Sequence, residues 1–175
     1  TTSYAYELLL ENDGLRKKLQ KLLKGLDVND LDALASVGSQ ARQLMLDAPF
    51  PAEVQSAIHE AYTRLGERIG KRVFEVAVRS SATAEDLPDA SFAGQQDTIL
   101  NVRGEENLIR ACHECYASLW TDRAISYRTA KGFDHFDVAL SIGIQPMVRS
   151  DAACSGVMFT LDTESGFRDV VTISG

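Results

Sequence analysis

The sequence predicts an α+β domain with a helical lead-in, and two observations carry this prediction. Apolar residues recur at helical spacing through residues 1–72, and short, largely apolar runs of the kind found in strands follow from residue 73. A long amphipathic stretch with helical periodicity separates the second of these runs from the third. Strand pairs mixed with helices that can cover them are typical of α+β domains.

Helices are predicted in succession through the lead-in. The first ends near Gly25 and carries apolar residues on one face, namely Leu15, Leu19, Leu22, Leu23 and Leu26. Asp30 can cap the second helix, which residues 47–51 interrupt, and Pro51 suits the first position of a third. Their apolar faces predict packing against a core and against neighbouring domains.

Strands are predicted at 73–78, 97–102, 138–145, 156–161 and 169–173. The first is almost wholly apolar, as expected of a central strand. A helix over about 106–131 follows the second strand, and Gly132 suits its end. A turn at residues 164–166 should join the last two strands as a hairpin.

Composition excludes several classes of protein. The net charge of −7 argues against sequence-independent binding to nucleic acid or to an anionic membrane, because both need a basic surface. No apolar run is long enough to span a bilayer, and the first residues lack the pattern of a signal peptide. We therefore expect a cytoplasmic protein.

The cysteines include a C-x-x-C sequence, Cys112 to Cys115, which raises the alternative of a metal or redox site. This sequence lies within a helical pattern, and Cys154, the only other cysteine, does not complete a ligand set. We expect Cys112 and Cys115 to be buried on a helix face, since free cysteine behaves as a small hydrophobe.

Residues 77–102 are the most informative segment for function. Arg79 directly follows the apolar strand and precedes a loop of small and acidic residues. A fixed cation beside small residues that allow the backbone to approach suits the phosphates of a nucleotide. The alternative is a salt bridge between Arg79 and Glu85 or Asp86 at the end of the strand.

Several segments together resemble the N-terminal nucleotide-binding domain of the phosphoenolpyruvate synthase (pyruvate, water dikinase) family of PEP-utilising dikinases. They are LDVNDLDAL (26–34), APFP (48–51), residues 76–102, SLWTDRAISYR (118–128), KGFDH (131–135), QPMVRSD (145–151) and SGVMFTLDTESGF (155–167). The resemblance implies an ATP-grasp domain, with residues 1–72 as its helical lead-in and residues 73–175 as its α+β portion. It also implies that the chain is truncated at both ends.

The family's reaction converts ATP, pyruvate and water to AMP, phosphoenolpyruvate and phosphate through a phosphohistidine, with Mg²⁺ required. By this resemblance the phosphohistidine and pyruvate-binding domains lie outside these residues, so we expect the chain alone to be inactive. Its partners would be ATP, other domains of the same polypeptide, and a second subunit if the protein is a homodimer.

The resemblance also implies site residues. Arg79 matches the arginine that contacts the ATP phosphates, which makes it the candidate catalytic residue. Gly94 and Thr98 match positions beside the nucleotide, and Gln145 matches a glutamine at the adenine, where backbone groups of Met147 and Val148 would add contacts. Pro146 departs from the family pattern and removes one N–H donor.

The metal ligands of the family would lie beyond residue 175, so none is expected in this chain. An alternative is a magnesium site in the loop at 80–91, formed by Glu85, Asp86 and Asp89. The interpretation that we favour for this loop is a solvated flap over the phosphates.

Other functions stay open at this point. Rifampin phosphotransferase shares much of the 79–102 segment, and pyruvate, phosphate dikinase is a more distant possibility. A non-catalytic nucleotide-binding module is the alternative from another class of protein.

Overall fold

The computed structural model describes residues 1–82, 86–87, 90–91 and 97–175. Its α-helices are α1 (Ser3–Glu11), α2 (Leu15–Leu23), α3 (Leu31–Asp47), α4 (Ala52–Ile69), α5 (Glu105–Ala117) and α6 (Asp122–Lys131). Short 3₁₀ turns lie at Asn12–Gly14, Ser118–Trp120 and Ser150–Ala152. The strands are β1 (Glu75–Ala82), β2 (Asp86–Leu87), β3 (Ala90–Ser91), β4 (Thr98–Arg103), β5 (Leu140–Pro146), β6 (Val157–Phe159) and β7 (Thr172–Ser174).

The main sheet has the order β4-β1-β5, and both of its strand pairs are antiparallel. The register between β1 and β4 shifts between Val76 and Val78, so that Leu100 and Asn101 of β4 lie opposite a single residue of β1. Asn101 accordingly has a positive φ of 57°, which asparagine tolerates better than most residues. The pairs β2–β3 and β6–β7 form separate two-stranded units.

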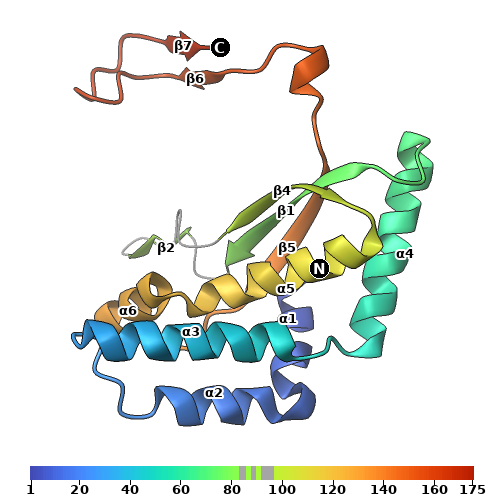
Figure 1. The fold of residues 1–175 in the computed structure, drawn as a ribbon. Helices are drawn as coiled ribbons and strands as arrows, with labels where there is room; N and C mark the ends of the chain where they lie inside the picture. Colours follow the sequence, from blue (N-terminus) through green and yellow to red (C-terminus); the bar gives the residue numbers. More distant parts are fainter. Residues whose placement is uncertain (83–85, 88–89, 92–96) are drawn as a thin grey trace.

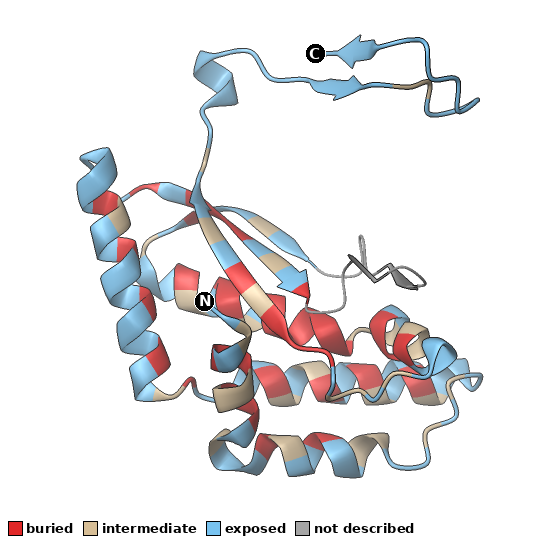
Figure 2. Ribbon diagram, turned by 180° about the vertical axis from the view of Figure 1, so that it is seen from behind, coloured by how far each residue is buried: buried red, intermediate tan, exposed pale blue. Residues whose placement is uncertain are grey.

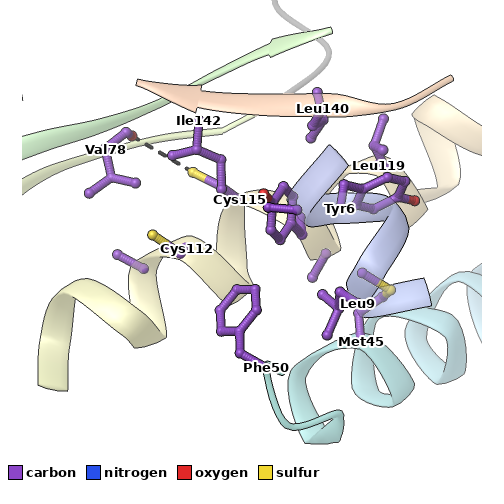
Figure 3. Packing of buried hydrophobic residues seen from close by; sticks show 14 of the residues in the cluster. Tyr6, Leu9, Met45, Phe50, Val78, Cys112, Cys115, Leu119, Leu140 and Ile142 are labelled. Atoms are coloured by element: carbon purple, nitrogen blue, oxygen red, sulfur yellow. Dashed lines mark hydrogen bonds between the residues drawn. The ribbon is translucent and has the colours of Figure 1, made fainter. Parts of the chain in front are cut away.

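Helices cover one face of the main sheet (Figure 1). Helices α1 and α5 contact the sheet directly, α3 packs on α5, and α2 packs on α3. The buried residues, red in Figure 2, gather where the sheet and these helices meet. In Figure 3 the ring of Phe50 and the side chains of Leu9 and Met45 lie beneath the sheet strands.

Several predicted helix boundaries are confirmed. The side chain of Asp30 caps α3 by accepting a hydrogen bond from the N–H of Ala33 at 3.0 Å. Gly132 ends α6 with a φ of 73°, the left-handed conformation that glycine adopts without strain. Pro51 differs slightly from its prediction, because it is the N-cap of α4 and not the first helical residue.

Helix α1 was not predicted, because its sequence lacks the usual start signals. Its N-cap, Thr2, makes no side-chain hydrogen bond, and the chain turns sharply at Asp13 and Gly14 directly after the helix. The helix is nevertheless buried on one face, where Tyr6, Leu9 and Leu10 are inaccessible to solvent. Tertiary packing therefore stabilises α1, as is common for short helices.

The prediction of one continuous helix over about 106–131 is wrong, because two helices, α5 and α6, occupy this range. A 3₁₀ turn at Ser118–Trp120 ends α5, and Thr121 caps α6 by accepting a hydrogen bond from the N–H of Ala124 at 3.3 Å. The apolar periodicity continues across the break, because both helices bury the same side. Periodicity alone could not reveal the cap.

Strand β1 differs from its predicted limits of 73–78. It begins at Glu75 and continues to Ala82, because Ser80, Ser81 and Ala82 pair with β5. Arg79 therefore lies within the strand and not at its end. This correction matters for the site, since the guanidinium is anchored to a central strand that is paired on both sides.

The predicted C-terminal hairpin is confirmed, with shorter strands than expected. Strands β6 and β7 pair antiparallel, and the connecting turn places Gly166 at a φ of 74°. Figure 1 shows the hairpin beyond the main sheet, on the side away from the helices. Figure 2 shows its residues as almost entirely exposed. Among the described residues, no helix combines the length and the apolar character needed to cross a membrane.

A buried polar contact joins α6 to the loop that follows it. Arg128 is inaccessible to solvent, its Nε donates to Nδ1 of His135 at 3.1 Å, and its guanidinium lies 5.3 Å from the ring centroid of Trp120. Burial, and then the positive charge of Arg128, lower the pKa of His135 to about 4. Burial lowers the pKa of Arg128 to about 10. The folded domain thus holds His135 neutral as an acceptor.

This contact predicts that the domain loses stability in mild acid. Between the ordinary histidine pKa of about 6.5 and the folded value, the unfolded chain binds a proton that the folded chain excludes. The free energy of unfolding should therefore fall as the pH drops through this window, by about 2 kcal/mol from His135. Denaturant-dependent hydrogen exchange of α6, measured between pH 7 and pH 4.5, checks this.

Glutamine at position 135 keeps an acceptor for Arg128 but does not titrate, so His135→Gln should remove most of the pH dependence. His113 offers a comparison, because burial also lowers its pKa. The matched His113→Gln variant should keep the contribution of His135. An unchanged pH profile in His135→Gln would contradict the assignment.

Candidate functional site

The main sheet has one face that the helices leave open, and three of the predicted site residues, Arg79, Thr98 and Gln145, are found there. Along β1, Val76 and Val78 are buried toward the helices, whereas Glu75 and Arg79 are exposed on the other side. Residues directly opposite one another in antiparallel strands share a face of the sheet. The register therefore decides which residues of β4 and β5 accompany Arg79.

Arg79 lies opposite Thr98 of β4 and Gly143 of β5. Ala77 lies two positions earlier in β1, on the same face, and it pairs with Gln145 of β5. The structure thus brings together Arg79, Thr98 and Gln145, although Arg79 and Gln145 are 66 residues apart in the sequence (145 − 79). All three are exposed.

The surroundings of Arg79 leave its charge available. Among the residues that the structure describes, no carboxylate forms an ion pair with its guanidinium. Among the described residues, a Cβ added at Gly143 would meet only the carbonyl oxygen of Arg79, at 3.8 Å, so these residues leave space on this side. An exposed arginine beside open space and a hydroxyl suits an anionic ligand.

Strand β1 owes its position to α5, which lies under it. Figure 3 shows Cys115 reaching up to the strand, and its Sγ lies 3.7 Å from the carbonyl oxygen of Val78, the residue before Arg79. Cys112 and Cys115 are both fully buried, as predicted, and burial raises the pKa of each thiol to about 12. They support the site as core residues and stay protonated.

The end of β5 continues into the segment predicted to contact adenine. The N–H of Met147 donates to the carbonyl oxygen of Glu75 at 2.9 Å, so that this donor is already used by the sheet. The predicted backbone contacts of Met147 and Val148 with adenine stay predictions, and for Met147 the carbonyl oxygen is the backbone group that this hydrogen bond leaves free to serve. Val148 is 81% exposed, and its carbonyl oxygen accepts from the N–H of Ser150 at 3.0 Å.

Some predicted residues cannot be placed. Gly94, Glu85 and Asp89 lie outside the described residues, as does the side chain of Asp86. Across the residues that the structure does describe, no group of three or more His, Cys, Asp or Glu side chains is arranged to hold a metal ion. The histidines have other contacts: His59 pairs with Glu105 at 2.6 Å, and the ring of His113 lies 4.0 Å from that of Phe50.

Sequence reasoning missed two residues of the open face, Gly143 and Glu75. Gly143 belongs with Arg79 only because of the pairing of β1 with β5. The charged residues Glu75 and Arg79 stand four positions apart in the sequence, which places both on one face of a strand, and this spacing could have indicated Glu75.

Comparison with known proteins decides the family. The family model described as pyruvate phosphate dikinase, AMP/ATP-binding domain, matches residues 1–175, which is the whole chain. The chain belongs to this family. Within the family it is similar to proteins that carry the name phosphoenolpyruvate synthase.

Three of these relatives illustrate the similarity. The phosphoenolpyruvate synthase of Pseudomonas aeruginosa is 58% identical over 175 residues, which is 100% of this chain and 22% of that protein. The enzyme of Synechocystis is 57% identical over 99% of this chain and 22% of its own length. That of Escherichia coli is 52% identical, again over 99% of this chain and 22% of its own length. The chain therefore spans about a fifth of each relative.

Proposed function

We propose that this chain is the ATP-binding portion of a phosphoenolpyruvate synthase. The overall reaction would convert ATP, pyruvate and water to AMP, phosphoenolpyruvate and phosphate. The observation that carries the proposal is the open sheet face, where Arg79 stands without an ion-pair partner among the described residues, between Thr98 and Gly143. Membership of the AMP/ATP-binding family supports the nucleotide as its ligand.

In this proposal the fold is the nucleotide-binding part of an ATP-grasp domain, and the nucleotide lies along the open face. The guanidinium of Arg79 would bind two phosphate oxygens at once and stabilise the negative charge that develops during phosphoryl transfer. The hydroxyl of Thr98 would donate to a neighbouring phosphate oxygen. Gln145, two positions further along the sheet, would read the edge of the base through its amide.

Other parts of the reaction need groups beyond these. Mg²⁺ would neutralise the phosphate charge when bound, and its ligands would come from outside the described residues. The phosphoryl group would pass to a histidine and then to pyruvate on other domains of the protein. The contribution of this chain is to bind ATP, orient its phosphates and supply the cation of Arg79.

The alternatives receive less support. Relatives at 48–58% identity over nearly the whole chain carry the name phosphoenolpyruvate synthase, which favours this enzyme over the antibiotic-modifying dikinases. Pyruvate, phosphate dikinase shares the family model but not the names of these relatives. A non-catalytic nucleotide-binding module would also use Arg79 to bind phosphates, and it is the names of the relatives that favour an enzyme.

Product analysis on the full-length protein tests the proposal. The protein is supplied with ATP and Mg²⁺, with and without pyruvate, and AMP, phosphate and phosphoenolpyruvate are quantified. We expect all three products in equal amounts, and phosphoenolpyruvate only with pyruvate. If AMP forms only with another acceptor, the acceptor substrate is not pyruvate. If no acceptor leads to AMP, the result favours the non-catalytic nucleotide-binding module.

A further inference from the structure

A second charged group lies on the open sheet face, four positions before Arg79 in β1. This group is the carboxylate of Glu75, which is exposed. Arg103 of β4 lies opposite it in register, and Met147 lies beside it on the other flank, joined through the backbone hydrogen bond to the Glu75 carbonyl oxygen. The three residues therefore form a row that crosses the sheet.

This row forms part of the wall of a cavity of about 420 Å³ at the edge of the sheet. Val73, Pro146 and Met147 contribute apolar surface, while Lys71, Glu75 and Arg103 contribute charges. Its wall combines apolar and charged groups, so that a ligand with an apolar ring and polar edges could contact both.

The position of the cavity relative to Arg79 fits a nucleotide. The four residue steps from Glu75 to Arg79 cover about 13 Å along an antiparallel strand, comparable with the distance between the base and the terminal phosphate of an extended nucleoside triphosphate. Gln145 lies between the two positions, opposite Ala77. A triphosphate at Arg79 would thus place its base near the cavity.

Glu75 is the one carboxylate among the described residues that line the cavity, beside the cations Lys71, Arg103 and Arg149. Both Nε and Nη2 of Arg149, which also lines the cavity, are bound by the carboxylate of Asp151. No ion pair holds the carboxylate of Glu75 within the described part of the chain. A carboxylate accepts hydrogen bonds but does not donate them. Adenine presents an amino group at the position where guanine presents a carbonyl oxygen.

We infer that Glu75 is a specificity-determining residue, whose carboxylate accepts a hydrogen bond from the exocyclic amine of adenine and repels the carbonyl oxygen of guanine. This inference rests on the proposed function, because it requires a nucleoside triphosphate on the open face. Beyond the proposed function, it states that Glu75, which belongs to no motif, selects the base of the nucleotide.

The test compares nucleotide binding by variants of the full-length protein, with ATP, GTP and inorganic tripolyphosphate as probes in the presence of Mg²⁺. In Glu75→Gln the amide both donates and accepts, so the ratio of the dissociation constants for GTP and ATP should fall by about tenfold. Tripolyphosphate has no base, and its affinity should not change. Glu53→Gln, which alters an exposed carboxylate at the far end of α4, is the matched control and should keep the ratio.

The outcomes separate the two proposals. An unchanged ratio in Glu75→Gln, in a protein that binds ATP and loses tripolyphosphate binding in Arg79→Ala, would overturn the role of Glu75 and leave the proposed function standing. A wild-type protein that binds neither ATP nor tripolyphosphate would overturn both. An equal fall of the ratio in Glu53→Gln would also overturn the inference, because the effect would not depend on the cavity.

Discussion

Replacing Arg79 by alanine should lower ATP-dependent phosphoryl transfer by about a hundredfold to a thousandfold in the full-length protein. The guanidinium is exposed on the open sheet face and has no ion-pair partner among the described residues. Its removal therefore takes a cation from the phosphates without breaking a contact that stabilises the fold. The rate of AMP formation, with the thermal unfolding temperature measured in parallel, checks both halves of this expectation.

Two further variants sharpen the test. Arg79→Lys keeps the charge but not the planar pair of donors, so it should recover only part of the activity. Arg64→Ala removes an exposed arginine of α4 that lies 3.8 Å from Glu60, and it should behave as wild type. Full activity of Arg79→Ala would refute the assigned role, and an equal loss in Arg64→Ala would indicate a general effect of charge.

Replacing Trp120 by alanine should destabilise the domain by about 3–5 kcal/mol, a large part of the free energy of unfolding of a typical domain. Trp120 is inaccessible to solvent and packs at 5.5 Å, between ring centroids, from Phe136. Its truncation would leave a cavity and would also remove the ring that faces the buried guanidinium of Arg128. Hydrogen exchange of α5 and α6 under increasing denaturant reports this domain within a longer protein.

Arg128 provides the control that separates packing from charge. It is buried without a carboxylate, and within the described structure its Nη1 and Nη2 have no hydrogen-bond partner. Arg128→Met keeps much of the volume and removes the desolvated charge, so it should be at least as stable as wild type. A strong loss of stability in Arg128→Met, with little in Trp120→Ala, would show that the charge and not the ring holds this region.

Much of the local structure could be predicted from the sequence, because helix caps and helix ends depend on residues that are close together in the chain. The Asp30 cap and the Gly132 stop depend on side chains within one helical turn, and the structure confirms both. The break at Ser118–Trp120 escaped prediction because apolar periodicity continues through it. Helix α1 escaped because only burial against distant segments stabilises it.

By itself, the sequence determined the α+β class, the helical lead-in and the family resemblance, and it singled out Arg79 as a candidate, all from composition, periodicity or contiguous motifs. Only the tertiary structure decided that Arg79 lies inside a strand, opposite Thr98 and Gly143, and that Glu75 shares its face. The register of antiparallel strands sets these neighbours, since a shift of one residue would move every side chain to the other face. That register depends on the bulge at residues 100–101 and on the core beneath the sheet, which join segments far apart in the chain.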